Sequence, residues 1–364
     1  MYNNLHEQAA PRFTIGQTDG VEEYVLSALQ ETCQRNRLCE DVTSELRCRF
    51  LQSLRAVMPT IGEKSRSVGV TEPIAESRDI FNALGDHFVS HDSVLHGGEH
   101  FEQAQEHLKG GGNVLLVQNH QSGADNLLME TLLRRAYGDD IVQDWAYMSG
   151  HAVNIYAIPL IMTSGLRRFQ IFSAKYQSMA ASGGQIMQET GADAAEMNRQ
   201  NNRAMRALLR YATEGGKTVV LYPEGGRGDE AMVRIEPKTT AVPYLMTKND
   251  IPLMILPTFV SGTRNILPVT RSDNEYNEFI QNARVGAGSM TVGAPVPWTD
   301  IVGFAEDRSV IDRYVQNGMV DGDIGDKSIT RVIAADTIGH LIARLAPDEQ
   351  ARGPYQDEKL CQFA

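Results

Sequence analysis

The sequence predicts an α/β fold: a central mixed sheet flanked by helices and preceded by a smaller N-terminal helical domain. Before about residue 112, apolar residues recur at helical spacings and strand signals are few. After that point, short apolar strands alternate with amphipathic helices, which is typical of a layered α/β domain. We place the helical domain at residues 1–88 and the α/β domain at residues 89–364.

The helical domain is predicted from two stretches. Residues 21–58 place leucine, valine and phenylalanine at helical spacings, and Pro59 and Gly62 interrupt the pattern. A second helical stretch covers residues 73–88. Together they account for a helical region of roughly 80 to 90 residues, large enough to bury an apolar face of its own.

The α/β domain begins with the strand 113–117, which follows three glycines and leads through a polar segment into a helix at 124–137. The last helix is amphipathic, and we expect Ser328 to cap it. The elements expected between them are strands at 171–172, 218–222 and 252–260 and helices at 195–212 and 239–247.

Composition limits the classes of function. Hydrophobic residues make up 42% and charged residues 22%, as in an ordinary globular protein. The net charge of −12 argues against a broad nucleic-acid surface and against strong attraction to anionic membranes. No apolar run approaches the roughly 20 residues of a membrane span, so at most peripheral membrane contact is expected. Four cysteines without metal or disulfide spacing, and an N-terminus unlike a signal peptide, favour a soluble cytoplasmic protein.

The segment Asn119-His120-Gln121-Ser122-Gly123-Ala124-Asp125 is the strongest chemical signal. His120 follows a buried strand, and Asp125 begins the next helix, where α/β proteins place their sites. A carboxylate there can fix the imidazole tautomer and stabilise the imidazolium, so that the histidine acts as general base toward a hydroxyl. The alternative is that His120 caps a loop and Asp125 caps the helix.

A second polar motif ends another apolar strand about 100 residues later. In Tyr222-Pro223-Glu224-Gly225-Gly226-Arg227 the two glycines allow close backbone approach to a ligand, and the arginine offers forked donors to a phosphate. Between the two motifs, Ile171-Phe172-Ser173-Ala174-Lys175 is a further strand leading to a cation.

In this order, these blocks resemble the glycerol-3-phosphate and lysophosphatidate acyltransferase family, most closely its soluble plastid-type glycerol-3-phosphate acyltransferases, which also carry an N-terminal helical domain. The resemblance covers roughly residues 100–300. It implies that His120 deprotonates the acceptor and that Asp125 orients His120. It also implies that Lys175 and Arg227 bind the acceptor's phosphate, while Glu224, Gly225 and Gly226 shape that wall. The acyl donor would be the thioester of acyl carrier protein or CoA, with no cofactor and no metal.

Two positions depart from the family pattern. Tyr176 stands where the soluble members usually have histidine, and Asp229 stands where they have a second arginine. The leading prediction is a soluble glycerol-3-phosphate 1-O-acyltransferase of phospholipid synthesis. The runner-up is an acyltransferase of specialised metabolism with a non-phosphorylated alcohol or amine as acceptor. A non-catalytic module that binds acyl carriers is the third possibility. Acyl-chain length, the choice of donor and oligomeric state stay open.

The sequence contains two further patterns of possible functional residues. His96-Gly97-Gly98-Glu99-His100 fits the His-x-x-Glu-His zinc motif, but that motif needs one continuous helix and two central glycines disfavour it, so we expect a loop. Arg199, Arg203, Arg206 and Arg210 recur along the helix expected at 195–212, and the plainer interpretation is a solvated helix face.

Overall fold

The computed structural model describes residues 21–60, 69–150, 160–161, 163–172, 177, 192–224, 232, 235, 237–247, 250–268, 282–316, 319, 326–348 and 352. These residues form one nine-stranded sheet with strand order β1-β5-β4-β6-β3-β7-β8-β2, and β9 also pairs with β7. The strands are β1 (Val70–Thr71), β2 (Val94–His96), β3 (Asn113–Gln118), β4 (Ala146–Gly150), β5 (Arg167–Ile171), β6 (Thr218–Leu221), β7 (Leu253–Ser261), β8 (Ser289–Val292) and β9 (Val296–Pro297).

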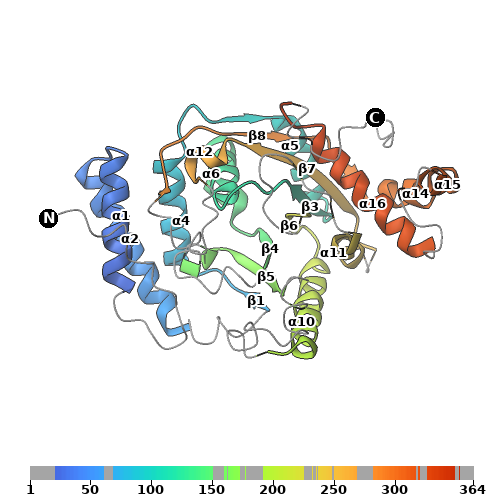
Figure 1. Cartoon of the computed structure of the whole chain (residues 1–364), viewed down its shortest axis with the longest axis horizontal. Coiled ribbons are helices and arrows are strands. Elements are labelled where there is room, and N and C mark those ends of the chain that lie inside the picture. Colours follow the sequence, from blue (N-terminus) through green and yellow to red (C-terminus); the bar gives the residue numbers. More distant parts are fainter. Residues whose placement is uncertain are drawn as a thin grey trace.

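The sheet is mixed, as predicted. Its centre, β5-β4-β6-β3-β7, is parallel throughout. Antiparallel pairings join β1 to β5 at one edge, and β8 and β9 to β7 toward the other. Parallel strands need crossover connections, and the helix between β5 and β6 is one of these. The predicted α/β class with a central mixed sheet and flanking helices is therefore confirmed (Figure 1).

Helices cover both faces of this sheet. Along β3 the side chains alternate: Val114 and Leu116 join one core, whereas Leu115 and Val117 join the other. The first core includes residues of α1 (Val21–Arg35), α2 (Glu40–Val57), α4 (Ala75–Phe88), α5 (Gly98–Lys109), α6 (Asp125–Tyr137) and α12 (Thr263–Ile266). The second includes residues of α10 (Ala194–Ala212), α11 (Ala241–Met246), α14 (Trp298–Glu306), α15 (Arg308–Gln316) and α16 (Asp326–Ala343). Single 3-10 turns lie at Met58–Thr60, Asp139–Val142 and Pro237–Thr240.

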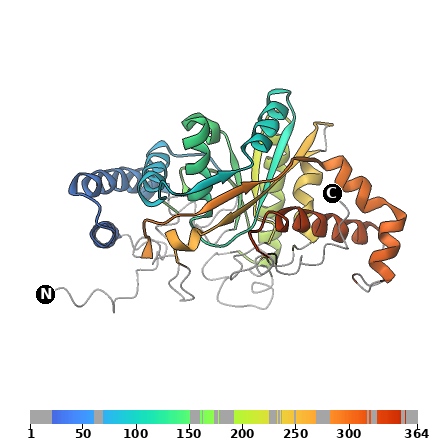
Figure 2. The ribbon, with the colours of Figure 1, turned by 90° about the horizontal axis from the view of Figure 1, so that it is seen from above.

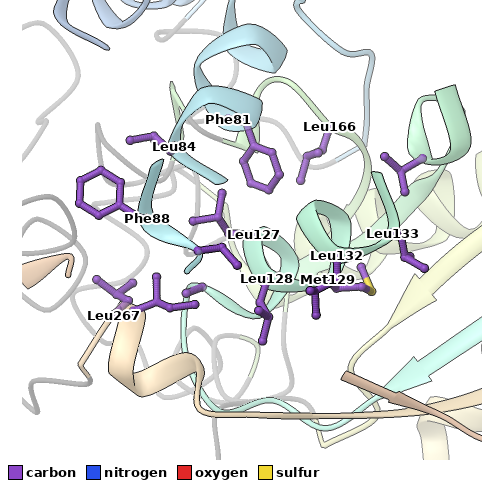
Figure 3. Close-up of a cluster of buried hydrophobic side chains, with 14 of the residues drawn as sticks. Phe81, Leu84, Phe88, Leu127, Leu128, Met129, Leu132, Leu133, Leu166 and Leu267 are labelled. Carbon is purple, nitrogen blue, oxygen red and sulfur yellow. The ribbon is translucent and has the colours of Figure 1, made fainter. Parts of the chain in front are cut away.

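The N-terminal helices lie at one end of the molecule and α14, α15 and α16 at the other (Figures 1 and 2). Helix α4 packs on α6, the helix that follows β3. Figure 3 shows Phe81, Leu84 and Phe88 of α4 facing Leu127 and its neighbours on α6. The first core therefore runs across the predicted boundary between residues 88 and 89. That boundary stays a prediction.

Three details differ from the sequence-based expectations. The helical stretch predicted at 21–58 is divided into two helices, because Arg37 adopts a left-handed backbone with φ 56° between α1 and α2. The strands β1 and β2 lie before residue 112, where the sequence contains few strand signals. They are only two and three residues long, which is too short to show an alternating pattern of apolar and polar side chains. Helix α16 begins at Asp326, so Ser328 lies in its first turn and does not cap it. No helix in the described ranges is both long and apolar enough to cross a bilayer.

Candidate active site

The polar segment after β3 is anchored to the sheet before it turns away. The Asn119 side chain donates to the Val260 carbonyl (2.9 Å) and accepts from the Val260 N–H (2.8 Å), as a backbone pair would. The asparagine thus extends the β3–β7 pairing by one residue. His120 follows immediately and leaves the sheet at its carboxyl edge, where the parallel strands of α/β proteins carry their sites.

His120 and Asp125 are in direct contact. The imidazole Nδ1 lies 2.7 Å from Oδ2 of Asp125, whose side chain is 1% exposed while that of His120 is 24% exposed. The carboxylate also accepts the backbone N–H groups of Gln121 (2.8 Å) and Ser122 (3.0 Å). Asp125 lies in the first turn of α6, where the positive end of the helix dipole favours a negative charge.

This geometry fixes the protonation pattern of the imidazole. An ionised carboxylate only accepts hydrogen bonds, so Nδ1 must carry the proton that it shares with Asp125. Nε2 is then the unprotonated nitrogen, on a ring that remains partly open to solvent. A neutral imidazole with a free Nε2 and a buried carboxylate behind it can take a proton from a hydroxyl and hold the resulting positive charge.

The second motif lies beside the first because β6 pairs directly with β3 in parallel register, Leu221 opposite Val117. Glu224 follows β6, is buried, and accepts the backbone N–H of His120 through Oε2 at 2.6 Å. One carboxylate therefore holds the His120 main chain while another holds its side chain. Sequence reasoning placed Glu224 in the acceptor wall, and that role stays a prediction.

Tyr222 forms one face of the site. Its ring lies against the His120 imidazole, with ring centroids 4.4 Å apart and planes inclined by 31°. Its hydroxyl donates to Oδ1 of Asn126 and accepts from Nε2 of Gln118 at 3.4 Å. Burial raises the pKa of Tyr222 well above its ordinary value, with nearby Asp125 adding to the effect, so the phenol is neutral. No sequence motif marked these contacts, apart from the position of Tyr222 directly before Pro223-Glu224.

The remaining predicted site residues are not located. Lys175, Gly225, Gly226 and Arg227 lie outside the described residues, as do Tyr176 and Asp229. The structure therefore brings together His120, Asp125 and Glu224, and the phosphate-binding part of the prediction rests on sequence alone.

A second polar cluster lies farther along the same helix. Glu130 of α6 is buried and accepts a hydrogen bond from the hydroxyl of Tyr147 on β4. Its Oε2 also forms an ion pair with Nη1 of Arg78 on α4 at 2.7 Å, although the angles of this contact are not those of a hydrogen bond. Burial raises the pKa of Glu130, while the charges of Arg78 and Arg134 oppose that rise. This cluster joins α4 and α6 beneath the sheet face and contacts neither His120 nor Asp125 directly.

An apolar hollow begins next to Asp125. Ala124, the residue before Asp125, lines it together with other apolar side chains, and the hollow has a volume of about 20 Å³ and is partly open to solvent. The other lining residues come from α1, α4, α6 and the α12 region: Leu29, Leu84, Phe88, Leu127, Ile266, Leu267 and Ala283.

The histidines of the His-x-x-Glu-His pattern do not share a helix. His96 ends β2, Gly97 has a left-handed φ of 72°, and α5 begins at Gly98, so His100 lies in a different element. Glu99 lies on α5 beside His100, 3.8 Å from its Nε2. The described part of the chain contains no group of three or more potential metal ligands, and the pattern lacks the helix that the zinc motif requires.

Comparison with known protein families gives one match for this part of the chain. Residues 95–261 match the family model described as Acyltransferase. The match begins in β2 and ends with β7, so it includes the His120–Asp125 pair and Glu224. A search of curated proteins found no significant match. Residues 95–261 are therefore similar to an acyltransferase domain, and this similarity supports a general acyl transfer activity.

Proposed function

We propose that this protein transfers a fatty acyl group from a thioester to a hydroxyl by general-base catalysis. The observation that carries the proposal is the 2.7 Å contact between His120 Nδ1 and Asp125 on a partly exposed imidazole whose Nε2 is free of that contact. The acyltransferase family match supplies the reaction class. Together they favour an active enzyme over a module that only binds acyl carriers.

The proposed reaction transfers the acyl group directly and needs no acyl-enzyme intermediate. Nε2 of His120 takes the acceptor's hydroxyl proton as the oxygen attacks the thioester carbonyl, and Asp125 stabilises the imidazolium that forms. The tetrahedral intermediate collapses, the C–S bond breaks, and the leaving thiolate takes the proton back from His120. An ester and a free thiol result, and the imidazole returns to its starting state.

The direct test is a thioester-consumption assay with a panel of acceptors, with and without phosphate groups. Wild-type protein should release free thiol only when an acceptor is present, and His120→Ala should not. Thiol release at the same rate without acceptor would indicate hydrolysis and contradict the transferase proposal.

The leading acceptor is glycerol 3-phosphate, making the protein a glycerol-3-phosphate 1-O-acyltransferase of phospholipid synthesis. The support is the resemblance of Lys175 and Arg227 to the family's phosphate-binding positions. Replacing either cation with alanine should raise KM for glycerol 3-phosphate by roughly 10- to 150-fold, the equivalent of a charge-assisted hydrogen bond. An unchanged KM in both variants would remove the phosphate site from the proposal.

A non-phosphorylated alcohol or amine is the second candidate, because Tyr176 and Asp229 occupy family phosphate-site positions and Asp229 adds a negative charge. Asp229→Arg discriminates between the two candidates. The substitution should improve use of glycerol 3-phosphate if the pocket is a modified phosphate site. If wild type ignores glycerol 3-phosphate and Lys175→Ala leaves acylation of a neutral acceptor unchanged, the second candidate is correct.

We propose the apolar hollow beside Ala124 as the start of the acyl-chain site, since apolar side chains line it one residue from Asp125. Leu267→Trp should then shift the preferred donor toward shorter chains, measured as kcat/KM across a series of acyl lengths. A general loss at all lengths would indicate damage to the fold, and an unchanged profile would place the chain elsewhere.

We further propose that the reaction needs no metal and no nucleotide. The acyl group of a thioester is already activated toward nucleophilic attack, and His120 supplies the base. Activity should therefore persist in EDTA and without ATP. If chelation abolished activity and zinc restored it, a zinc site that includes His96 and His100 would be supported instead.

A further inference from the structure

Four arginines form a line along the solvent face of α10: Arg199, Arg203, Arg206 and Arg210, here called the arginine stripe. Their spacing of four, three and four residues keeps them on one side of the helix. All four are exposed, whereas Met197, Ala204 and Leu208 on the opposite side of the helix are buried. The stripe spans about 16 Å at the helical rise per residue.

The stripe is a local exception in an acidic protein. Helix α10 contains four arginines and one glutamate, a net charge of +3, so the rest of the chain carries −12 − 3 = −15. Within the described ranges only Arg199 of the stripe forms an ion pair, with Glu196 at 2.7 Å. A surface helix stabilised by its own charges usually intersperses both signs at these spacings, and this helix does not.

The stripe begins at the edge of the sheet that carries the site. Helix α10 connects two parallel strands, β5 and β6, so its N-terminal end lies at their carboxyl edge, the edge at which His120 leaves β3 (Figure 1). The Asn201 side chain fixes this end: it accepts from the Phe172 N–H (2.7 Å) and donates to the Phe172 carbonyl (2.9 Å), directly after β5. A partner lying along the stripe is therefore held beside the edge where acyl transfer takes place.

We infer that the arginine stripe is the docking surface for an acidic carrier protein that bears the acyl group as a thioester. The inference rests on the proposed function, because it assigns the donor of that reaction. A carrier with carboxylates along one helix face complements a line of guanidinium groups about 16 Å long, whereas the phosphates of a small thioester engage only one or two of them. A membrane surface fits less well, since the large hydrophobic side chains that are exposed in the described part of the chain all lie outside α10: Val70, Val94, Val285 and Val315.

The test is Arg203→Glu/Arg206→Glu in the full chain, because both side chains are exposed and the double reversal should leave the fold intact. The matched control is Arg55→Glu/Arg313→Glu, which makes the same change of charge at exposed positions on α2 and α15. Each protein is assayed with palmitoyl-acyl carrier protein and with palmitoyl-CoA, and carrier binding is measured separately by fluorescence anisotropy at low and high salt.

Steering by a charged surface changes association by roughly 10- to 1,000-fold, so kcat/KM for the carrier-linked donor should fall at least ~10-fold in the stripe variant. It should change less than about twofold with palmitoyl-CoA, and carrier binding should weaken with added salt in wild type. Equal loss with both donors, unchanged carrier use, or loss in the control would overturn the inference. If wild type transfers from neither donor but binds the carrier through the stripe, the docking surface stands and the proposed activity fails. Absence of carrier binding in wild type would refute the stripe alone.

Discussion

Helix α6 carries two buried carboxylates five residues apart, and their surroundings differ in one decisive respect. Asp125 has its charge matched by His120, a partner that can gain and lose a proton and is 24% exposed. Glu130 is matched by Arg78, which stays protonated in proteins, and by the buried Tyr147. Both clusters are polar and both link α6 to a neighbouring element. The first can exchange a proton with a bound substrate, whereas the second can only hold helices together.

The largest effect should come from breaking the first cluster. His120→Ala is expected to lower kcat by about 10²–10⁴, the contribution of a positioned general base, with little change in thermal stability. His91→Ala, an exposed turn histidine, serves as the control. A folded His120→Ala protein with near-normal turnover would refute the mechanism.

Matched amide substitutions compare the two carboxylates directly. Asp125→Asn presents an amide that can donate to Nδ1, which moves the imidazole proton to Nε2, so kcat should fall within the same range of about 10²–10⁴. Glu130→Gln should leave kcat per folded molecule within about twofold, because no proton passes through that cluster. Steady-state kinetics on both variants, with the folded fraction measured by circular dichroism, would separate the roles. A comparable decrease in kcat in the two variants would show that both clusters contribute to catalysis.

Arg78→Ala should lower the free energy of unfolding and leave catalysis by the folded protein unchanged. Removal of one partner of a buried ion pair costs about 3–5 kcal/mol, because the remaining charge has lost its partner. Urea unfolding should show this decrease, while kcat of the folded fraction stays near wild type. The double variant Arg78→Met/Glu130→Leu should recover much of the lost stability, and Arg55→Ala on the exposed face of α2 should change little. Failure of the double variant to recover would show that the cluster does more than neutralise itself.

Tyr222 tests how far the first cluster extends. Tyr222→Leu removes the ring that lies against His120, and a face-on aromatic contact to a cation is worth about 0.5–1 kcal/mol at an exposed site, so kcat should fall about 2- to 5-fold. Tyr222→Phe keeps the ring and loses only the hydroxyl contacts with Asn126 and Gln118, so its loss should be smaller. If the phenylalanine variant loses as much as the leucine variant, the hydroxyl positions the site and the ring does not.

The smallest effect concerns pH. Burial raises the pKa of Glu130 in the folded state, so between the unfolded value of about 4.5 and the folded value the native protein binds more protons than the unfolded chain. Stability from this group is therefore complete below the unfolded pKa and declines as pH rises through the folded pKa. The stability difference between wild type and Glu130→Gln should shrink as pH increases across this interval, as measured by urea unfolding at several pH values. A difference that grows with pH would reverse the assigned direction.

Sequence alone located the first cluster because its parts are local. A buried apolar strand, a polar break and a helix start place His120 and Asp125 within one loop, and the loop forms as expected. The position of Glu224 was also predicted, but its hydrogen bond to the His120 backbone was not, because that contact depends on β6 pairing with β3. The fold class followed from the change in periodicity near residue 112.

The second cluster could not be predicted for the opposite reason. Arg78, Glu130 and Tyr147 come from three separate elements, and nothing in their spacing distinguishes them from solvated charges or an ordinary core tyrosine. Short strands were missed on similar grounds: β1 pairs with β5 through only two residues, and its position is set by the partner strand. The break between α1 and α2 was missed because Arg37, a residue with no turn preference, occupies the left-handed conformation.

The chain travels 104 positions from His120 to Glu224 and returns to the adjacent strand. The strands β4 and β5 lie to one side of that strand pair, whereas α6, which follows β3 and carries Asp125, packs toward β2, β7 and β8. His120 and Glu224 are therefore brought together by the direct pairing of β3 with β6, and the segment from β4 to α10 forms a separate flank of the sheet. Protein engineers could exchange the segment from β4 to α10 with the corresponding segment of a related protein, while β3, α6 and β6 keep His120, Asp125 and Glu224 in place.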